Sequence, residues 1–68
     1  MRSMPGKELA KLLEEHGWTL LRINGSHHIY GKPGNRARVS VPIHGNQPIK
    51  IGLLKHLLVA AGLESAGP

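Results

Sequence analysis

Two adjacent histidines, His27 and His28, follow Gly25 and Ser26 in the segment NGSHHIYG, residues 24–31. The unperturbed pKa of imidazole is about 6.5, so a histidine can give or take a proton near neutral pH. The chain has only five histidines in 68 residues. The adjacent pair is therefore the first candidate for acid–base chemistry.

The other histidines have simpler explanations. His16 falls at the end of a predicted helix, where a positive charge interacts favourably with the helix dipole. His56 falls on a second predicted helix and is expected to face solvent. His44 lies in a predicted loop, where it could reach a bound ligand. Of these three, only His44 is kept as a candidate binding residue.

Few residues in this chain could complete a metal site. It has no cysteine, and Glu64 is the only acidic residue C-terminal to Glu15. Histidines in zinc sites are usually joined by cysteines or carboxylates. We therefore expect neither a metal ion nor another cofactor, and without cysteine no disulfide framework can form.

The charge of the chain favours an anionic partner. Nine Lys and Arg against four Asp and Glu give a formal net charge of +5, and nucleic acid is the first such partner to consider for a small basic domain. An acidic protein is the alternative partner. The residues expected to contact RNA are Arg22, Lys32, Arg36, Arg38, His44 and Lys50.

Two helices are predicted, one near each end of the sequence. The leucine spacing in KELAKLLEEHG predicts a helix over residues 5–16, ended by Gly17. A second apolar stripe in IKIGLLKHLLVAAGL, residues 49–63, predicts the other helix.

Three strands are predicted between these helices. WTLLRI, residues 18–23, and HHIYG, residues 27–31, flank the pair Asn24-Gly25, which is the strongest short hairpin signal. RARVSVPI, residues 36–43, alternates apolar and polar side chains as a half-buried strand does. The strands should form an antiparallel sheet.

The predicted class is α+β, in the order α-β-β-β-α, as a single domain of residues 1–68 with a frayed tail at 64–68. Both helices should pack on one face of the sheet, which leaves the other face open. No apolar run approaches the about 20 residues of a membrane span, and no signal peptide is evident, so we expect a cytoplasmic protein without a membrane partner.

The alternation of side chains along a strand sends His27 and His28 to opposite faces. Ile29 is strictly apolar, whereas Tyr30 tolerates water at its hydroxyl. If Ile29 is buried, His27 faces the core and His28 projects from the open face. Arg36 and Arg38 of the next strand would then join His28 on that face, because Val39 and Val41 face the core.

The register of the hairpin stays open. A two-residue loop at Asn24-Gly25 places Leu21 opposite His28, and a three-residue loop places Arg22 there. The sequence does not decide between these registers.

Four segments of the chain resemble the HicA-type toxins, also called the YcfA-like family. They are GKELAKLLEEHGW, GSHHIY, VSVPIHG and IKIGLLKHLLVAAGL, in the order and spacing of that family, and the resemblance covers about residues 7–63. It implies a fold like that of a double-stranded-RNA-binding domain, endoribonuclease activity on messenger RNA (mRNA interferase), and inhibition by a cognate HicB-type antitoxin. The catalytic histidine of the family lies in the Gly-Ser-His-His segment, and we place it at His28.

The residues suit the chemistry that this resemblance implies. RNA cleavage through its own 2′-hydroxyl needs a base, an acid and nearby cations, and none of these requires a metal. His28 with neighbouring Arg and Lys supplies the minimum, and His27 and Tyr30 are candidates for a secondary catalytic group. Two alternatives remain, a non-catalytic double-stranded-RNA-binding module and a protein-interaction domain of the same fold.

Overall fold

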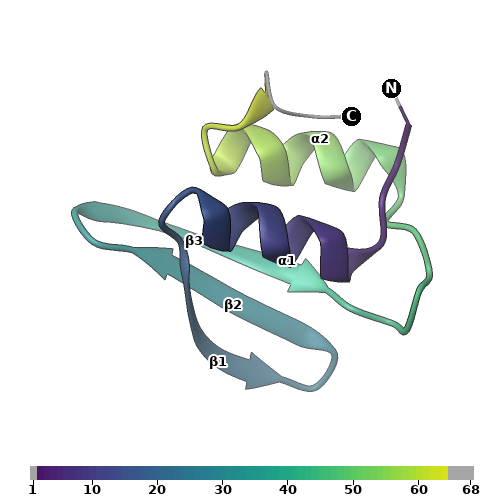
Figure 1. Ribbon diagram of the computed structural model, residues 1–68, viewed down its shortest axis with the longest axis horizontal. Helices are drawn as coiled ribbons and strands as arrows, with labels where there is room; N and C mark the ends of the chain where they lie inside the picture. Colours follow the sequence, from purple (N-terminus) through teal and green to yellow (C-terminus); the bar gives the residue numbers. More distant parts are fainter. Residues whose placement is uncertain (1, 65–68) are drawn as a thin grey trace.

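The computed structural model describes residues 2–64 of the chain. Its elements follow the order α1 (Gly6–Glu15), β1 (Thr19–Asn24), β2 (His27–Lys32), β3 (Asn35–Pro42) and α2 (Ile51–Ala60), shown in Figure 1. The strands form one antiparallel sheet in the order β1-β2-β3. The predicted α+β order is confirmed. Most of the predicted frayed tail falls on residues 65–68, which lie outside the described residues.

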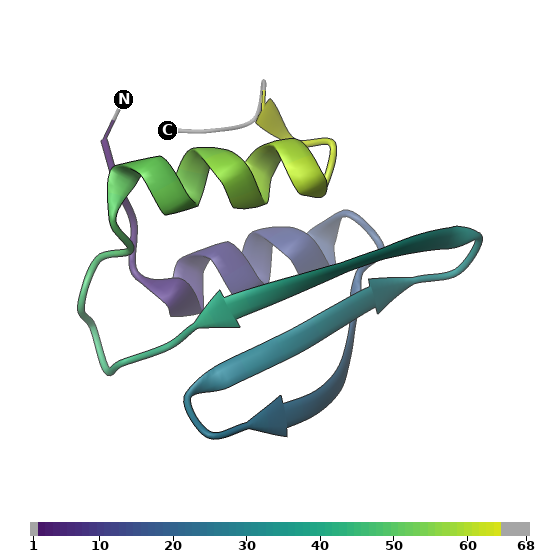
Figure 2. The same ribbon diagram turned by 180° about the vertical axis from the view of Figure 1, so that it is seen from behind.

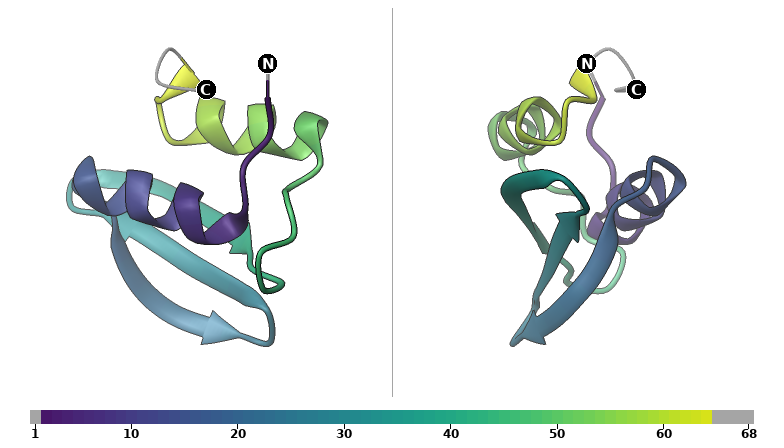
Figure 3. Two further views of the ribbon diagram at one scale, coloured as in Figure 1. Left: turned by 45° about the vertical axis from the view of Figure 1, so that its right-hand side comes forward. Right: turned by 90° about the vertical axis from the view of Figure 1, so that its left-hand side faces the viewer.

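The two helices pack against the same face of the sheet. α1 lies across this face, and α2 lies beyond β3 on the side away from β1 (Figures 1 and 3). The predicted arrangement is confirmed, and the opposite face is open; the likeness to a double-stranded-RNA-binding domain stays a prediction. The largest fully buried side chains come from both helices and from alternate positions of β3: Leu9, Leu13, Leu54, Leu58, Val39 and Val41.

Glycines fix both ends of α1. Gly6 lies so close to β3 that a Cβ atom there would overlap the carbonyl oxygen of Pro42. Gly17 has a φ of +90°, the left-handed conformation that ends many helices, and the N–H of Trp18 donates to the carbonyl oxygen of Leu13 at 3.0 Å. The start of α1 therefore packs directly on the C-terminal end of β3.

The turn between β1 and β2 lies one residue later than predicted. Its two residues are Gly25 and Ser26, and Asn24 pairs with His27 across it. Gly25 has a φ of +63°, and a positive φ at the first of two turn residues is what a type II′ hairpin turn requires. Glycine meets this requirement without steric cost.

The register of β1 opposite His28 differs from both predictions. Ile23 pairs with His28, whereas the sequence allowed Leu21 or Arg22 at this position, so both predicted registers are wrong. Moving a turn by one residue moves every pairing along the hairpin by two. A β-bulge between Leu20 and Arg22 then places Leu21 outside the regular pairing.

β1 is an exposed edge strand. All six of its residues are exposed, and it pairs only with β2 among the described strands. The exposed fractions of Leu20, Leu21 and Ile23 are 39%, 51% and 57%. Because α2 lies on the far side of β3, no helix of residues 2–64 runs beside the outer side of β1, which we call the β1 edge (Figure 2).

Neither helix could cross a lipid bilayer. Each of the two helices within residues 2–64 has 10 residues, whereas a helical membrane span needs about 20.

Candidate active site

Three histidines gather at one end of the sheet, where the β1–β2 turn meets the loop after β3. The backbone N–H of Ile43 donates to the carbonyl oxygen of Ser26 at 2.8 Å, which ties the loop to the turn. The Oγ atom of Ser26 lies 3.5 Å from Nε2 of His44. Ser26 is followed directly by His27 and His28. We call these three histidines the histidine end.

The two adjacent histidines lie on opposite faces, in the reverse of the predicted arrangement. His28 pairs with Val41 and shares the helix-covered face with the buried Tyr30, and its own side chain is half-buried. His27 is exposed on the open face, where its Nδ1 atom lies 3.2 Å from Oγ of Ser40. The prediction that His28 projects from the open face is therefore wrong.

The burial of Tyr30 explains this reversal. Its hydroxyl donates to Oε2 of Glu14 at 3.2 Å, so the ring can enter the core without leaving its polar group unpaired. Ile29, which the sequence placed in the core, is instead half-buried on the open face. Burial, and then the charge and hydrogen bond of Glu14, raise the pKa of Tyr30 above its ordinary value of 10.0. This candidate secondary catalytic group faces α1.

Three of the predicted RNA-contacting residues share the open face with His27. Arg22 pairs with Ile29, whose side chain is on that face. Arg36 and Arg38 alternate along β3 with residues that face the helices. The arginines therefore accompany His27 and not His28.

The charged side chains of the sheet are all basic. Residues 16–63, which include the whole sheet, contain no acidic side chain. Nη1 of Arg38 donates to the carbonyl oxygens of residues 35, 36 and 37 at 3.3, 3.4 and 3.0 Å. Its guanidinium therefore folds toward the β2–β3 turn, at the other end of the strand from the histidine end.

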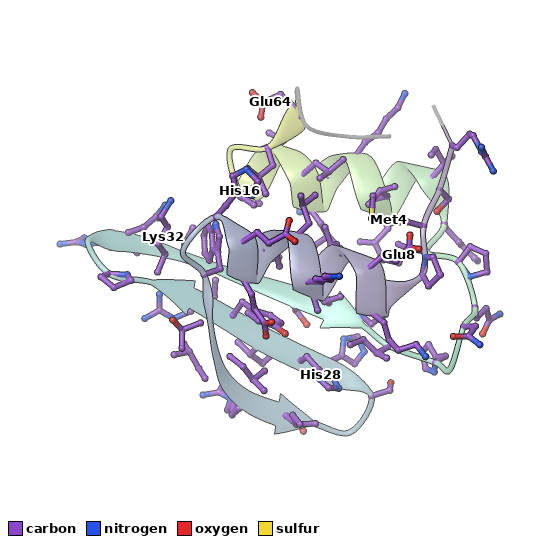
Figure 4. The ribbon with its side chains drawn as sticks, in the orientation of Figure 1. Met4, Glu8, His16, His28, Lys32 and Glu64 are labelled. Carbon is purple, nitrogen blue, oxygen red and sulfur yellow. The ribbon has the colours of Figure 1, made fainter. Side chains whose placement is uncertain are left out.

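Lys32 stabilises the fold away from the histidine end. Its Nζ atom lies 5.9 Å from the centroid of the Trp18 ring, within the range of a cation–π interaction. Figure 4 shows Lys32 and His28 near opposite ends of β2. The structure does not bring this predicted RNA-contacting residue to the histidines.

Lys50 and His44 both lie in the loop between β3 and α2. Both line a hollow of about 320 Å³ between the end of β3 and the start of α2. Two of the predicted RNA-contacting residues therefore border one surface depression beside the histidine end.

Comparison with known protein families gives a match that covers most of the chain. Residues 6–63 match the family described as HicA toxin of bacterial toxin-antitoxin. The chain belongs to the HicA toxin family. The resemblance predicted over about residues 7–63 is confirmed, and no curated protein matched the sequence. The chain is thus a toxin of a toxin–antitoxin pair, from a family known for ribonuclease activity, and its family implies a cognate antitoxin.

The chemical groups at the histidine end of this HicA toxin are imidazoles and hydroxyls. Within residues 2–64, no three His, Cys, Asp or Glu side chains are grouped so that they could hold a metal ion. Of the imidazoles and hydroxyls, imidazole has the unperturbed pKa that lies nearer neutral pH.

Sequence reasoning missed three residues that position the candidate groups. Ser40 holds the His27 ring, Ser26 contacts His44, and Glu14 holds the hydroxyl of Tyr30. Ser40 alternates with two buried valines, which is a recognisable signal for the open face. Glu14 carries no such signal, because a helix surface glutamate is ordinarily solvent-exposed.

Proposed function

We propose that this HicA toxin is an endoribonuclease that cleaves messenger RNA in the cytoplasm by histidine-dependent, metal-independent acid–base chemistry. One observation carries the proposal: an exposed imidazole, His27, lies on an open face that bears arginines and no acidic side chain. Such a face attracts the phosphates of RNA, and the imidazole can exchange protons near neutral pH.

The reaction needs two proton transfers. A base takes the proton of a ribose 2′-hydroxyl, whose oxygen then bonds to the adjacent phosphorus. The bond from phosphorus to the 5′-oxygen breaks as an acid gives that oxygen a proton. The products are a 2′,3′-cyclic phosphate and a free 5′-hydroxyl. Imidazoles can serve in both roles, and arginine or lysine side chains can stabilise the charge on the transferred phosphate.

His27 is our first choice for the group that contacts the reacting RNA. It meets the criteria that the sequence attached to His28, since it lies on the open face, outside the core and with the arginines. With Nδ1 beside Ser40, the ring offers Nε2 to a ligand. His28, which the family resemblance favoured, is the alternative catalytic residue, and Tyr30 is a secondary candidate.

His44 is the best placed partner for a second proton transfer. It comes from a different segment of the chain, yet its Nε2 atom lies 3.5 Å from the hydroxyl of Ser26, the residue before His27. An acid and a base from two segments could flank one phosphate.

The basic residues divide the RNA-binding role. Arg22, Arg36 and Arg38 would contact phosphates along the open face, and Lys50 would contact one beside His44. The cognate HicB-type antitoxin should silence the toxin by covering the sheet around the histidine end, with carboxylates opposite Arg36, Arg38 or Lys50. A complex with the sheet and its histidines uncovered would contradict this arrangement.

The proposal is tested by incubating the purified toxin with single-stranded RNA in EDTA at low salt. Fragments ending in a 2′,3′-cyclic phosphate are expected, and DNA of the same sequence should stay intact because it has no 2′-hydroxyl. RNA that is bound but never cut would indicate a non-catalytic RNA-binding module. Cleavage only after divalent metal is added would refute the metal-free mechanism.

A further inference from the structure

The loop between β3 and α2 borders a hollow that His44 and Lys50 share with residues to which the proposed chemistry gives no role. It has a volume of about 320 Å³ and lies at the start of α2, on the loop that Figures 1 and 2 show between β3 and α2. This volume is at the lower end of the range for small-molecule sites. Its lining residues are Pro42, His44, Gln47, Pro48, Ile49, Lys50 and Leu53.

The lining divides into an apolar wall and a polar rim. Ile49 is 5% exposed and Leu53 is 42% exposed, and the two prolines add rigid apolar surface beside them. The rim has one imidazole, one carboxamide and one ammonium group, from His44, Gln47 and Lys50, and no carboxylate. The hollow thus combines apolar surface, a group that both donates and accepts hydrogen bonds, and positive charge.

This combination fits one nucleotide. An unpaired base offers flat apolar faces and a hydrogen-bonding edge, and its phosphate is an anion. A carboxamide can pair with a base edge through its oxygen and its NH₂ group together. We propose that the hollow holds a single unpaired base of the RNA, whose edge is read by Gln47 and whose phosphate meets Lys50. The inference rests on the proposed function, because it fixes where one base of the RNA substrate lies when the toxin binds it.

The position of the hollow relates the base to the point of cleavage. His44 lines the hollow and also contacts Ser26, which precedes His27. A base in the hollow would therefore belong to a nucleotide next to the phosphate at the histidine end. Recognition of that base would select the sequence that is cut.

Two other hollows within the described residues suit this role less well. One lies between Thr19, Gly31 and Arg38, at the end of the sheet that is remote from His27. Another, lined by Lys55, Leu58, Val59 and Glu64, is almost wholly apolar and includes a carboxylate that would repel a phosphate. Neither of them adjoins a histidine of the candidate site.

The first test replaces the reading group. Gln47→Leu keeps the size of the side chain and removes its hydrogen bonds, and Asn46→Ala is the control because it removes a neighbouring amide that does not line the hollow. Cleavage sites are mapped on RNA of random sequence. Loss of one or two hydrogen bonds should reduce the preference for one base near the cut by about tenfold, with Asn46→Ala unchanged. An unaltered preference in Gln47→Leu would overturn the inference.

The second test measures binding without cleavage. The probes are 2′-deoxy tetranucleotides of each base, which lack the attacking hydroxyl, titrated while the NMR signals of the Gln47 carboxamide and the Leu53 methyls are followed. Leu53→Glu should weaken binding of the preferred probe about tenfold or more. Val59→Glu makes the same charge change at a site that is 62% exposed and outside the hollow, and it should weaken binding far less.

The outcomes separate the two proposals. If RNA is never cut but the probes still shift Gln47 and Leu53, the proposed function fails and the base site stands. If RNA is cut while Leu53→Glu and Val59→Glu bind the probes equally well, the base site is wrong and the ribonuclease stands.

Discussion

Tyr30 reaches Glu14 across the interface between sheet and helix, with its hydroxyl 3.2 Å from the carboxylate. This contact allows the tyrosine ring to be buried in a core that contains no phenylalanine. Side chains two residues apart in a strand share a face, so a buried Tyr30 brings His28 toward α1. His27 is thereby left on the open face. The hydrogen bond from Tyr30 to Glu14 is thus associated with the exposure of His27 to solvent.

The same contact predicts a loss of stability at high pH. A tyrosine whose pKa is raised in the folded state stabilises the fold below its unfolded pKa of 10.0, and that contribution is lost as the pH rises through the folded value. Near pH 7, the free energy of unfolding of Tyr30→Phe should be about 1 kcal/mol lower than that of the wild type, because phenylalanine cannot make the hydrogen bond to Glu14. As the pH rises from about 9 to about 11, the free energy of unfolding of Tyr30→Phe should fall less than that of the wild type. Thermal unfolding of both proteins at these pH values tests this; equal losses would mean that folding does not raise the pKa of Tyr30.

Replacing each of the adjacent histidines by alanine should give opposite results. His27→Ala removes an exposed side chain, so the free energy of unfolding should change by about 0.5 kcal/mol or less. RNA cleavage should fall by about 10²–10⁴, as for loss of a general acid or base. His28→Ala removes a half-buried side chain and should cost about 1 kcal/mol, with cleavage largely retained below its melting temperature. A folded His28→Ala protein without activity would transfer the catalytic role to His28.

A glycine pair tests the packing of α1 on β3. Gly6→Ala forces a methyl group into the carbonyl oxygen of Pro42, and relief of such overpacking typically costs about 1–3 kcal/mol. Gly52→Ala in α2 is the matched control, because a Cβ atom there would project into open space. Alanine should stabilise that helix by up to about 1 kcal/mol. In chemical denaturation, the midpoint should therefore fall for Gly6→Ala and rise for Gly52→Ala. Equal shifts would contradict the close approach at Gly6.

Two single-charge changes should separate RNA binding from fold stability. Arg22→Ala should weaken RNA binding and reduce the slope of log affinity against log salt by about 1. Lys32→Ala should leave that slope nearly unchanged and lower the melting temperature, because its ammonium group lies over Trp18. Filter binding at several salt concentrations, with thermal unfolding, distinguishes them. If Lys32→Ala reduces the slope as much as Arg22→Ala does, RNA extends across the helix-covered side.

The elements of this fold could be predicted because their signals are local. Leucine spacing gives α1, and the alternation of Val39 and Val41 gives β3 and its inward face. The faces of β2 could not be predicted, because they depend on a partner for Tyr30 that comes from another element, sixteen residues earlier. On hydrophobicity alone, Ile29 is expected to be more buried than its neighbour Tyr30.

The candidate site was only partly predictable for the same reason. The histidines are visible in the sequence, and His44 lies in a loop, as predicted. The contact of His44 with Ser26 spans 18 residues and depends on how the loop after β3 returns to the β1–β2 turn. The hairpin register was missed because Gly25 occupies the first turn position instead of the second.

The β1 edge also affects how toxin molecules meet one another. An edge strand with one unpaired side and exposed Leu20, Leu21 and Ile23 is a template on which a second copy could add its own β1. Arg22 in the middle of this strand and the net charge of +5 make two such edges repel. Salt weakens this repulsion, since exposed charges are screened beyond about 10 Å at 0.1 M ionic strength. Added salt, which we expect to weaken RNA binding, should therefore also bring the toxin closer to self-association through β1.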